Sequence, residues 1–189
     1  MKSRRRQGAP MSSTDTDTDT EKTSPSPSRR IVVCSGYMSP PHRGHMEYIR
    51  RSKELAGPDG KLIVILNNDR QAVLKHGYSF MPIDDRVAII QGLRWVDEVV
   101  VSIDEDRTVI RTLQSLAQRT AGDRPTHFTN AGDQTNAGIP EAAICSEYGI
   151  QLVDGLGDKV QSSRWLIGNA IDTVLEVKAK AKAKAETAS

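Results

Sequence analysis

Two histidines set three positions apart are the residues of this 189-residue chain best suited to chemistry. They are His42 and His45, and they end the segment GYMSPPHRGH, which begins at Gly36. If a helix starts there, both imidazoles project to nearly the same side, and the free amides of its first turn favour an anion. Gly44, between them, leaves room for a ligand to approach the backbone. This set of donors suits phosphate oxygens; a two-histidine metal site and two purely structural histidines are the alternatives.

The elements around this segment alternate between strand and helix. Short apolar runs rich in β-branched residues predict buried strands at 31–35, 61–66, 98–103, 126–129 and 150–153. Helices are predicted at 42–56, at 70–75, from Asp84, over 109–116 and 139–148, and near the end through Ile167, Ala170, Ile171 and Val174.

This alternation predicts an α/β fold, a single Rossmann-like, doubly wound domain over residues 31–177 with a five-stranded parallel sheet. Ligands in such folds bind at the carboxyl ends of the strands, near the point where the strand order reverses. The first strand usually lies at that point. We therefore expect the loop that carries His42 and His45 to form the ligand site.

Composition excludes several classes of protein. No apolar run approaches the roughly 20 residues of a membrane span, and the basic N-terminus lacks the apolar stretch of a secretory signal. Two cysteines, Cys34 and Cys145, are too few for a disulfide framework or a structural zinc site, and both are expected to be buried thiols. The net charge of +2 does not favour nucleic acid as a partner. We expect a cytoplasmic protein that binds neither membrane nor nucleic acid.

Two polar tails flank the predicted domain. Residues 1–30, with the repeats TDTDTDT and SPSPS, are predicted to be a disordered N-terminal tail, and Met1 and Met11 both remain as start sites. Residues 178–189 form a C-terminal tail rich in Lys and Ala, which can extend the last helix because both residues favour helices. The sequence is compatible with a homodimer.

Four stretches of the chain resemble the nucleotidylyltransferase superfamily, whose signature is H-x-G-H after the first strand. They are GYMSPPHRGH, LIVILNND followed by Lys75, MPIDDR leading into VDEVV, and QSSRWLI near the end. The chain is most similar to the group of glycerol-3-phosphate cytidylyltransferase, heptose-phosphate adenylyltransferase and FAD-synthetase-like enzymes. It departs from the pattern at Met38-Ser39, where many members have Phe-Asp and the acid helps to hold a metal or to orient the site.

The resemblance implies a role for each matching residue. His42, His45 and Lys75 would be catalytic, with His45 as the main stabiliser of the transition state. Arg86 would bind the phosphate of the acceptor, with an ion pair to Asp84 or Asp85 as the alternative. The residues expected to bind the nucleotide are Gly36, Tyr37, Gly44, Asp133, Ser162, Ser163 and Arg164. Ser162 and Ser163 would also cap the last helix. Mg²⁺ is the expected cofactor, with ligands unknown.

The implied function is transfer of CMP or AMP from CTP or ATP to a small phosphorylated alcohol or sugar, with release of pyrophosphate. The attacking phosphate is already ionised, so the protein has to position the reactants and neutralise charge. A non-catalytic nucleotide-binding regulatory module is the alternative, and Ser39 is the feature in its favour. The base and the acceptor cannot be read from the residues. His76 and His127 are expected at structural or surface positions, and Trp95 and Trp165 in the core.

Overall fold

The computed structural model describes residues 29–131, 138–156 and 161–187. Its elements are β1 (Ile31–Gly36), α1 (Arg43–Ala56), β2 (Lys61–Leu66), α2 (Asp69–His76), α3 (Ile83–Gln91), β3 (Glu98–Val101), α4 (Ile110–Ala117), β4 (His127–Thr129), α5 (Ala142–Glu147), β5 (Gln151–Val153) and α6 (Ser163–Thr187). No helix among these residues is long and apolar enough to cross a membrane.

The strands form one parallel sheet in the order β3-β2-β1-β4-β5, so the predicted Rossmann-like fold with five parallel strands is confirmed. Val33 of β1 pairs with Ile63 on one side and with Phe128 on the other. The chain moves outward from β1 through β2 to β3 and then returns to place β4 on the other side of β1. The strand order therefore reverses between β1 and β4, and the loop after β1 opens at that reversal.

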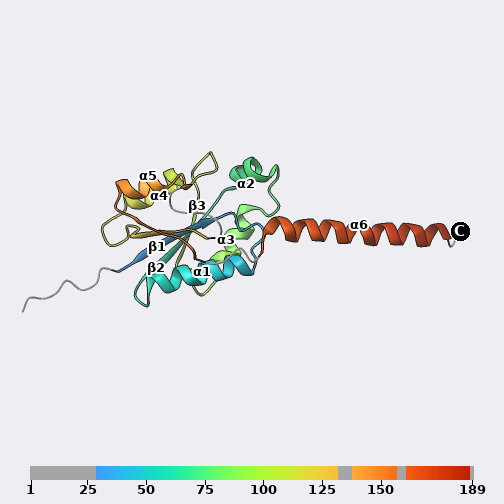
Figure 1. Ribbon diagram of the computed structural model, residues 1–189, viewed down its shortest axis with the longest axis horizontal. Coiled ribbons are helices and arrows are strands. Elements are labelled where there is room, and N and C mark those ends of the chain that lie inside the picture. Colours follow the sequence, from blue (N-terminus) through green and yellow to red (C-terminus); the bar gives the residue numbers. More distant parts are fainter. Residues whose placement is uncertain (1–28, 132–137, 157–160, 188–189) are drawn as a thin grey trace, which may run out of the picture.

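The core has two layers, because successive side chains of a strand point to opposite faces of the sheet. Ile31 and Val33 pack with α4 and α5, whereas Val32 and Cys34 pack with α1 and α3. Figure 1 shows these two helix pairs on the two faces of the sheet. Cys34 and Cys145 are both buried free thiols, as the sequence predicts. Full burial of one aliphatic side chain, such as that of Val33, stabilises the fold by about 1.5–3 kcal/mol. The two layers therefore hold the strand ends in place.

The strand β3 ends two residues earlier than its apolar run predicts. The chain turns at Ser102 because the buried carboxylate of Asp104 accepts hydrogen bonds from the backbone N–H groups of Arg111 and Thr112, at 2.7 and 3.0 Å. These bonds satisfy amides in the first turn of α4, which otherwise lack partners. A short polar segment therefore interrupts the apolar run to begin the next helix.

The last helix continues into the predicted tail. Residues 178–187 form the end of α6, in agreement with the helix propensity of their Lys and Ala residues. Residues 169–182 are all exposed, and α6 extends beyond the domain as a single rod (Figure 1). Trp165, expected in the core, is 57% exposed because it lies on this helix. Trp95 is partly buried against the α1 and α3 layer.

Candidate active site

The loop between β1 and α1 is held at its base by three anchors. The carbonyl of Gly36 accepts a hydrogen bond from the N–H of Asn67 at 3.1 Å, which joins it to the loop after β2. Met38 has a φ of +47° and a fully buried side chain, so it turns the chain and fills the core beneath. The hydroxyl of Ser39 accepts from the N–H of Met81 at 3.2 Å. The residues that follow are therefore presented at a defined position at the carboxyl edge of the sheet.

His42 and His45 form a stacked pair at the start of α1. Their ring centroids are 3.7 Å apart and the ring planes are inclined by 22°. The backbone N–H of His42 donates to Nδ1 of His45 at 3.3 Å. A neutral His45 that accepts at Nδ1 carries its proton on Nε2, which leaves Nε2–H as a donor. Nδ1 of His42 is buried and has no hydrogen-bond partner in the described part of the chain.

Both rings are held in the neutral form. Burial lowers the pKa of His42. For His45, burial lowers the pKa to about 3, helped by the positive charge of Lys75 and by the charge that His42 gains when it is protonated. The pair is therefore uncharged at neutral pH and offers hydrogen-bond donors. A group with so low a pKa is a weak base, which suits donation to a phosphate oxygen better than proton removal.

Lys75 reaches the same loop from the last turn of α2. Its Nζ lies 4.1 Å from the centroid of the Tyr37 ring, a distance at which a cation and an aromatic face attract each other. The ring of His76 meets Tyr37 edge-on, with centroids 5.5 Å apart. The hydroxyl oxygen of Tyr37 is buried and lacks a hydrogen-bond partner among the described residues. Tyr37 therefore links the loop after β1 to the end of α2.

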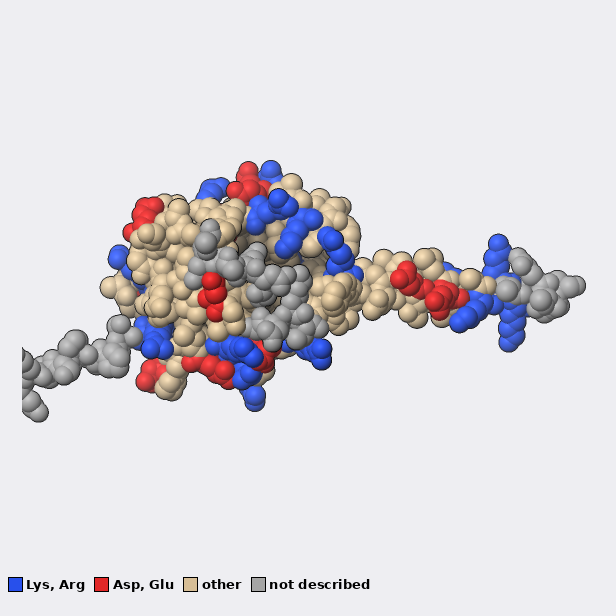
Figure 2. Space-filling model, in the orientation of Figure 1, with Lys and Arg blue, Asp and Glu red and all other residues tan. Residues whose placement is uncertain are grey.

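Positive charge collects around Lys75. Loss of hydration lowers its pKa, and the charges of Arg107 and Arg164 lower it further. Arg107 lies in the loop before α4, and Arg164 lies in the first turn of α6. Figure 2 shows Lys and Arg side chains gathered on the domain near the base of α6. Three cations from three separate segments therefore act on one place, which is an arrangement that favours a polyanion.

The start of α6 lies against the loop after β1. Ser162 caps the helix, because its hydroxyl accepts from the N–H of Trp165 at 3.2 Å. The hydroxyl of Ser163 donates to the carbonyl of Pro40 at 2.9 Å. The capping role that the sequence predicts is thus seen at Ser162, and the bond from Ser163 brings two helix N-termini to one edge of the sheet. Two such termini give two sets of free amides for anionic groups.

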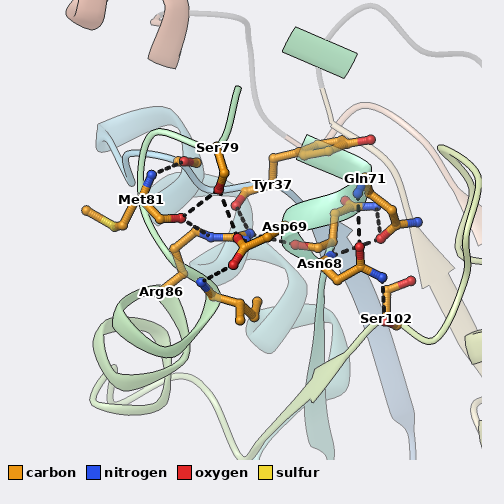
Figure 3. A network of polar contacts seen from close by, with 11 residues as sticks. Tyr37, Asn68, Asp69, Gln71, Ser79, Met81, Arg86 and Ser102 are labelled. Atoms are coloured by element: carbon orange, nitrogen blue, oxygen red, sulfur yellow. Dashed lines mark hydrogen bonds and ion pairs between the residues drawn. The ribbon is translucent and has the colours of Figure 1, made fainter. Parts of the chain in front are cut away.

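Arg86 has a different environment from the one expected. Its side chain is completely buried, and its guanidinium donates to the carbonyls of Tyr37, Asn67 and Met81 at 2.8, 2.6 and 3.0 Å. It also pairs with the carboxylate of Asp69 at 2.7 Å (Figure 3).

These contacts correct the expectation that Arg86 contacts the acceptor, because its guanidinium is enclosed and engaged by the protein itself. They also replace the expected ion pair with Asp84 or Asp85, both of which are exposed. Arg86 is a positioning residue that ties the loop after β1 to the loops that flank α2.

The remaining residues singled out in the sequence lie at different places in the chain relative to this site. Gly44 lies in the first turn of α1, between the two histidines. Asp133 lies outside the described residues. His127 lies at the opposite, amino-terminal end of β4, where its Nδ1 is 2.8 Å from the hydroxyl of Thr126. His76, expected at a structural or surface position, packs its ring against Tyr37. Arg107, whose charge acts on Lys75, was not singled out in the sequence and belongs to no motif.

The described residues include no ready-made cluster of metal ligands. Among the described residues there is no group of three or more His, Cys, Asp or Glu that could hold a metal ion. Ser39 stands at the position where many members of the resembled superfamily have an acid, and its hydroxyl accepts a hydrogen bond from the N–H of Met81. The nearby carboxylate of Asp69 is occupied by Arg86 and by the N–H of Ile83.

Comparison with known proteins identifies the family. The model of the family described as cytidylyltransferase-like matches residues 33–144, which is more than half of the chain and includes both histidines and Lys75. The chain belongs to the cytidylyltransferase-like family. Membership makes it a relative of nucleotidyltransferases, and the group predicted from the four stretches is confirmed.

Three curated relatives illustrate the range of the family. The bifunctional protein HldE of Streptomyces coelicolor is 31% identical over 126 residues, which cover 65% of this chain and 24% of HldE. The FAD synthase of Pyrococcus abyssi is 34% identical over 39% of this chain and 49% of its own length. The glycerol-3-phosphate cytidylyltransferase of Staphylococcus aureus is 32% identical over 36% of this chain and 50% of its own. The chain thus spans about a quarter to a half of these proteins.

A solved structure supports the fold. The lipopolysaccharide core biosynthesis protein from Thermoplasma volcanium superposes with a TM-score of 0.53 at 22% identity, over 66% of this chain and 94% of that protein. At this identity the likeness concerns the fold alone.

Proposed function

We propose that this protein transfers a CMP or AMP group from CTP or ATP to a small phosphorylated acceptor, an alcohol or sugar phosphate, and releases pyrophosphate. The observation that carries the proposal is the neutral, stacked pair of His42 and His45 beside Lys75, at the point where the strand order reverses. Family membership supports the reaction class.

Different hydrogen-bond donors of the site would hold the different phosphates of a bound triphosphate. The Nε2–H of His45 and the amides that open α1 would hold the α-phosphate, where charge develops as the acceptor attacks. His42, stacked on His45 at the start of α1, would donate through a ring nitrogen. Ser162, Ser163 and Arg164, at the start of α6, would hold the β- and γ-phosphates that leave as pyrophosphate.

Lys75 would bridge the donors at the start of α1 and those at the start of α6. Its ammonium group rests on the ring of Tyr37, and Arg107 and Arg164 repel it. A bound triphosphate would relieve that repulsion, so the affinity of the site for an anion is built into the free protein. The hydroxyl of Tyr37 would gain a partner in the same event, since it is buried without one.

This reaction does not require a general base, because the attacking phosphate oxygen is already ionised. The low pKa of His45 agrees with that requirement. The protein's contribution would be to align the acceptor with the α-phosphorus and to neutralise charge on the transferring group. Gly36 and Gly44 would leave space beside the phosphates.

We propose that Mg²⁺ enters with the triphosphate. Mg²⁺ keeps several waters and commonly binds substrate phosphates with one or two carboxylates. The described residues offer no ready-made group for it, so phosphate oxygens and water would be its main ligands. Bound in that way, it would neutralise charge on the phosphates.

The alternative is a non-catalytic nucleotide-binding module. Ser39 favours it, because its hydroxyl is bonded to the N–H of Met81 in a place where relatives carry an acid. The two functions differ in turnover and agree in nucleotide binding, so an assay of product formation separates them.

The experiment is a pyrophosphate-release assay with CTP or ATP, Mg²⁺ and a panel of alcohol and sugar phosphates. The His45→Ala variant should lose about 10²–10³-fold in turnover, the effect of removing one donor to a developing oxyanion. His127→Ala is the matched control, because His127 lies at the other end of the sheet, and its turnover should be unchanged. Nucleotide binding without pyrophosphate release for any acceptor would favour the regulatory module.

A further inference from the structure

The phosphate of the acceptor needs a cationic partner that Arg86 does not supply. The guanidinium of Arg86 is engaged by backbone carbonyls and by the carboxylate of Asp69. The donors at the starts of α1 and α6 would hold the triphosphate. A phosphate monoester carries about 1.5–2 negative charges at pH 7, so its site requires positive charge of its own. The loop between β3 and α4 offers such a charge in Arg107, which is exposed.

The backbone on both sides of Arg107 is fixed to α2. Nε2 of Gln71 donates to the carbonyl of Asp106 and to that of Thr108, in both cases at 2.7 Å. The side chain of Gln71 is completely buried, so this clamp is shielded from water. The amide of Asn68, at the start of α2, holds the beginning of the same loop through two further backbone carbonyls (Figure 3). Arg107 therefore has a defined place beside α2.

The side of α2 that holds this loop also carries Lys75. Gln71 and Lys75 are four residues apart, so they are neighbours on one face of the helix, with Cβ atoms about 5–6 Å apart. The ammonium group of Lys75 lies 4.1 Å from the centroid of the Tyr37 ring. Burial lowers the pKa of Lys75, and Arg107 is the charged group that lowers it most. Arg107 therefore faces the place where Lys75 and Tyr37 meet.

The acidic side chains of the loop are engaged by other groups. Asp104 accepts hydrogen bonds from two backbone amides of α4. Glu105 pairs with an arginine of α2, and Asp106 accepts from the N–H and the hydroxyl of Thr108 at 2.8 and 2.6 Å. Among the described residues, the side chain of Arg107 forms no hydrogen bond or ion pair. Its donors are available to a ligand, and an anion bound there would relieve its repulsion with Lys75.

The position of the loop assigns Arg107 to the acceptor rather than to the triphosphate. In phosphoryl transfer the attacking and the leaving oxygen lie roughly in line, on opposite sides of the phosphorus. The start of α6, which would hold the leaving pyrophosphate, lies against the loop after β1, and the chain reaches it from β5 at one edge of the sheet. Arg107 follows β3, which is the opposite edge. An acceptor on the β3 side would therefore attack from opposite the leaving group.

We propose that Arg107, beside Lys75, forms the subsite for the phosphate of the acceptor, a phosphate monoester. This inference rests on the proposed function. The guanidinium of Arg107 would give two parallel N–H···O bonds to the phosphate, the geometry for which arginine is suited. Lys75 would then contact both substrates where they meet, because it lies between the loop after β3 and the start of α6.

The first test measures the binding of inorganic phosphate by calorimetry at constant ionic strength. The full chain is first saturated with the α,β-methylene analogue of CTP or ATP, which cannot release pyrophosphate. The unaltered chain should bind phosphate, and Arg107→Gln should weaken that binding at least about tenfold, the effect of losing one hydrogen bond to a charged group. Arg107→Lys should recover part of the affinity, because it keeps the charge without the fork of donors. Both variants should bind the analogue almost as the unaltered chain does.

Arg111→Gln is the matched control. Arg111 is exposed in the first turn of α4, four residues beyond Arg107, and its charge acts on Asp106 instead. Phosphate binding by this variant should equal that of the unaltered chain. The melting temperature of Arg107→Gln without ligand should not fall, since the lost guanidinium is exposed and repels Lys75. A marked fall together with weaker binding would show a structural role and overturn the assignment.

Three binding results would overturn the proposal. The first is unchanged phosphate binding in Arg107→Gln. The second is equal weakening of phosphate and of the nucleotide analogue, because Arg107 would then belong to the triphosphate site. The third is absence of phosphate binding to the unaltered, nucleotide-loaded chain.

Pyrophosphate release separates this inference from the proposed function. With an acceptor that the unaltered chain uses, Arg107→Gln should raise the KM for the acceptor at least about tenfold and change the KM for the nucleotide little. An active unaltered chain with an unchanged acceptor KM in the variant would overturn the role of Arg107 and leave the proposed function intact. No release by the unaltered chain with any acceptor would contradict the proposed function, whereas loss of phosphate binding in Arg107→Gln would still support the subsite.

Discussion

Replacing Arg86 by Met tests whether this arginine positions the site or binds substrate. The change keeps much of the aliphatic volume and removes every hydrogen bond of the guanidinium. The carbonyls of Tyr37, Asn67 and Met81 lose their charged donor, and Asp69 loses its ion-pair partner. The three carbonyls belong to three separate loops, so we expect both the stability of the domain and the placement of Tyr37 to suffer.

The magnitude follows from burial. An unsatisfied buried acceptor costs about 1–3 kcal/mol, and removing one partner of a buried ion pair costs about 3–5 kcal/mol. The side chain of Asp69 is 41% exposed, so water hydrates its carboxylate once the ion pair is lost. The costs of the individual lost contacts therefore do not simply add. We therefore expect a loss of about 3–5 kcal/mol in the free energy of unfolding. For a chain of this size that lowers the melting temperature by about 6–20 °C.

Calorimetry and steady-state kinetics are the two assays. Arg70→Met is the matched control, because Arg70 is exposed and pairs with the exposed Glu105 at 3.5 Å. Its melting temperature should change little. Arg86→Lys should recover part of the stability, since it restores the charge but not the fork of donors. An unchanged melting temperature in Arg86→Met, together with a raised KM for the acceptor alone, would refute the positioning role and restore the contact with the acceptor.

Two further predictions concern the groups proposed to bind phosphate. Replacing Ser162 and Ser163 together by Ala should weaken binding of CTP or ATP more than of CMP or AMP, because the lost contacts fall on phosphates that a monophosphate lacks; calorimetric titration measures this, and equal weakening would remove the serines from the β- and γ-phosphate site. The pKa of about 3 for His45 predicts that stability falls as the pH drops below the ordinary value of 6.5, since the unfolded chain then binds a proton that the folded chain does not. The contribution reaches about 1.4 kcal/mol per pH unit, and urea unfolding of the unaltered chain and of His45→Gln from pH 7 to pH 5 should show a shallower decline in the variant; equal slopes would contradict the neutral His45.

Local patterns determined the parts of the protein that depend on short stretches of chain. The β-branched runs and the turns between them predict five strands near their observed positions along the chain, because a strand buried on both faces needs a continuous apolar run. The spacing of His42 and His45 is also local, since both belong to one helical turn. The same holds for Ser162, which caps α6 from the position that its residue type favours.

Only the tertiary structure decided what depends on distance through space. Arg86 reads as a charged residue in an exposed helix start, yet carbonyls from residues 19 and 49 positions away enclose it. Arg107 and His76 belong to no motif and join the site because the carboxyl ends of β1, β2 and β3 meet at one edge.

The exposure of α6 was also decided only by the tertiary structure. Its periodic apolar residues predict a helix with one apolar side, but periodicity does not say what covers that side. Residue type and spacing set the conformation of each segment, whereas the neighbours of a side chain come from segments far apart in the chain, and those are known only once the chain has folded.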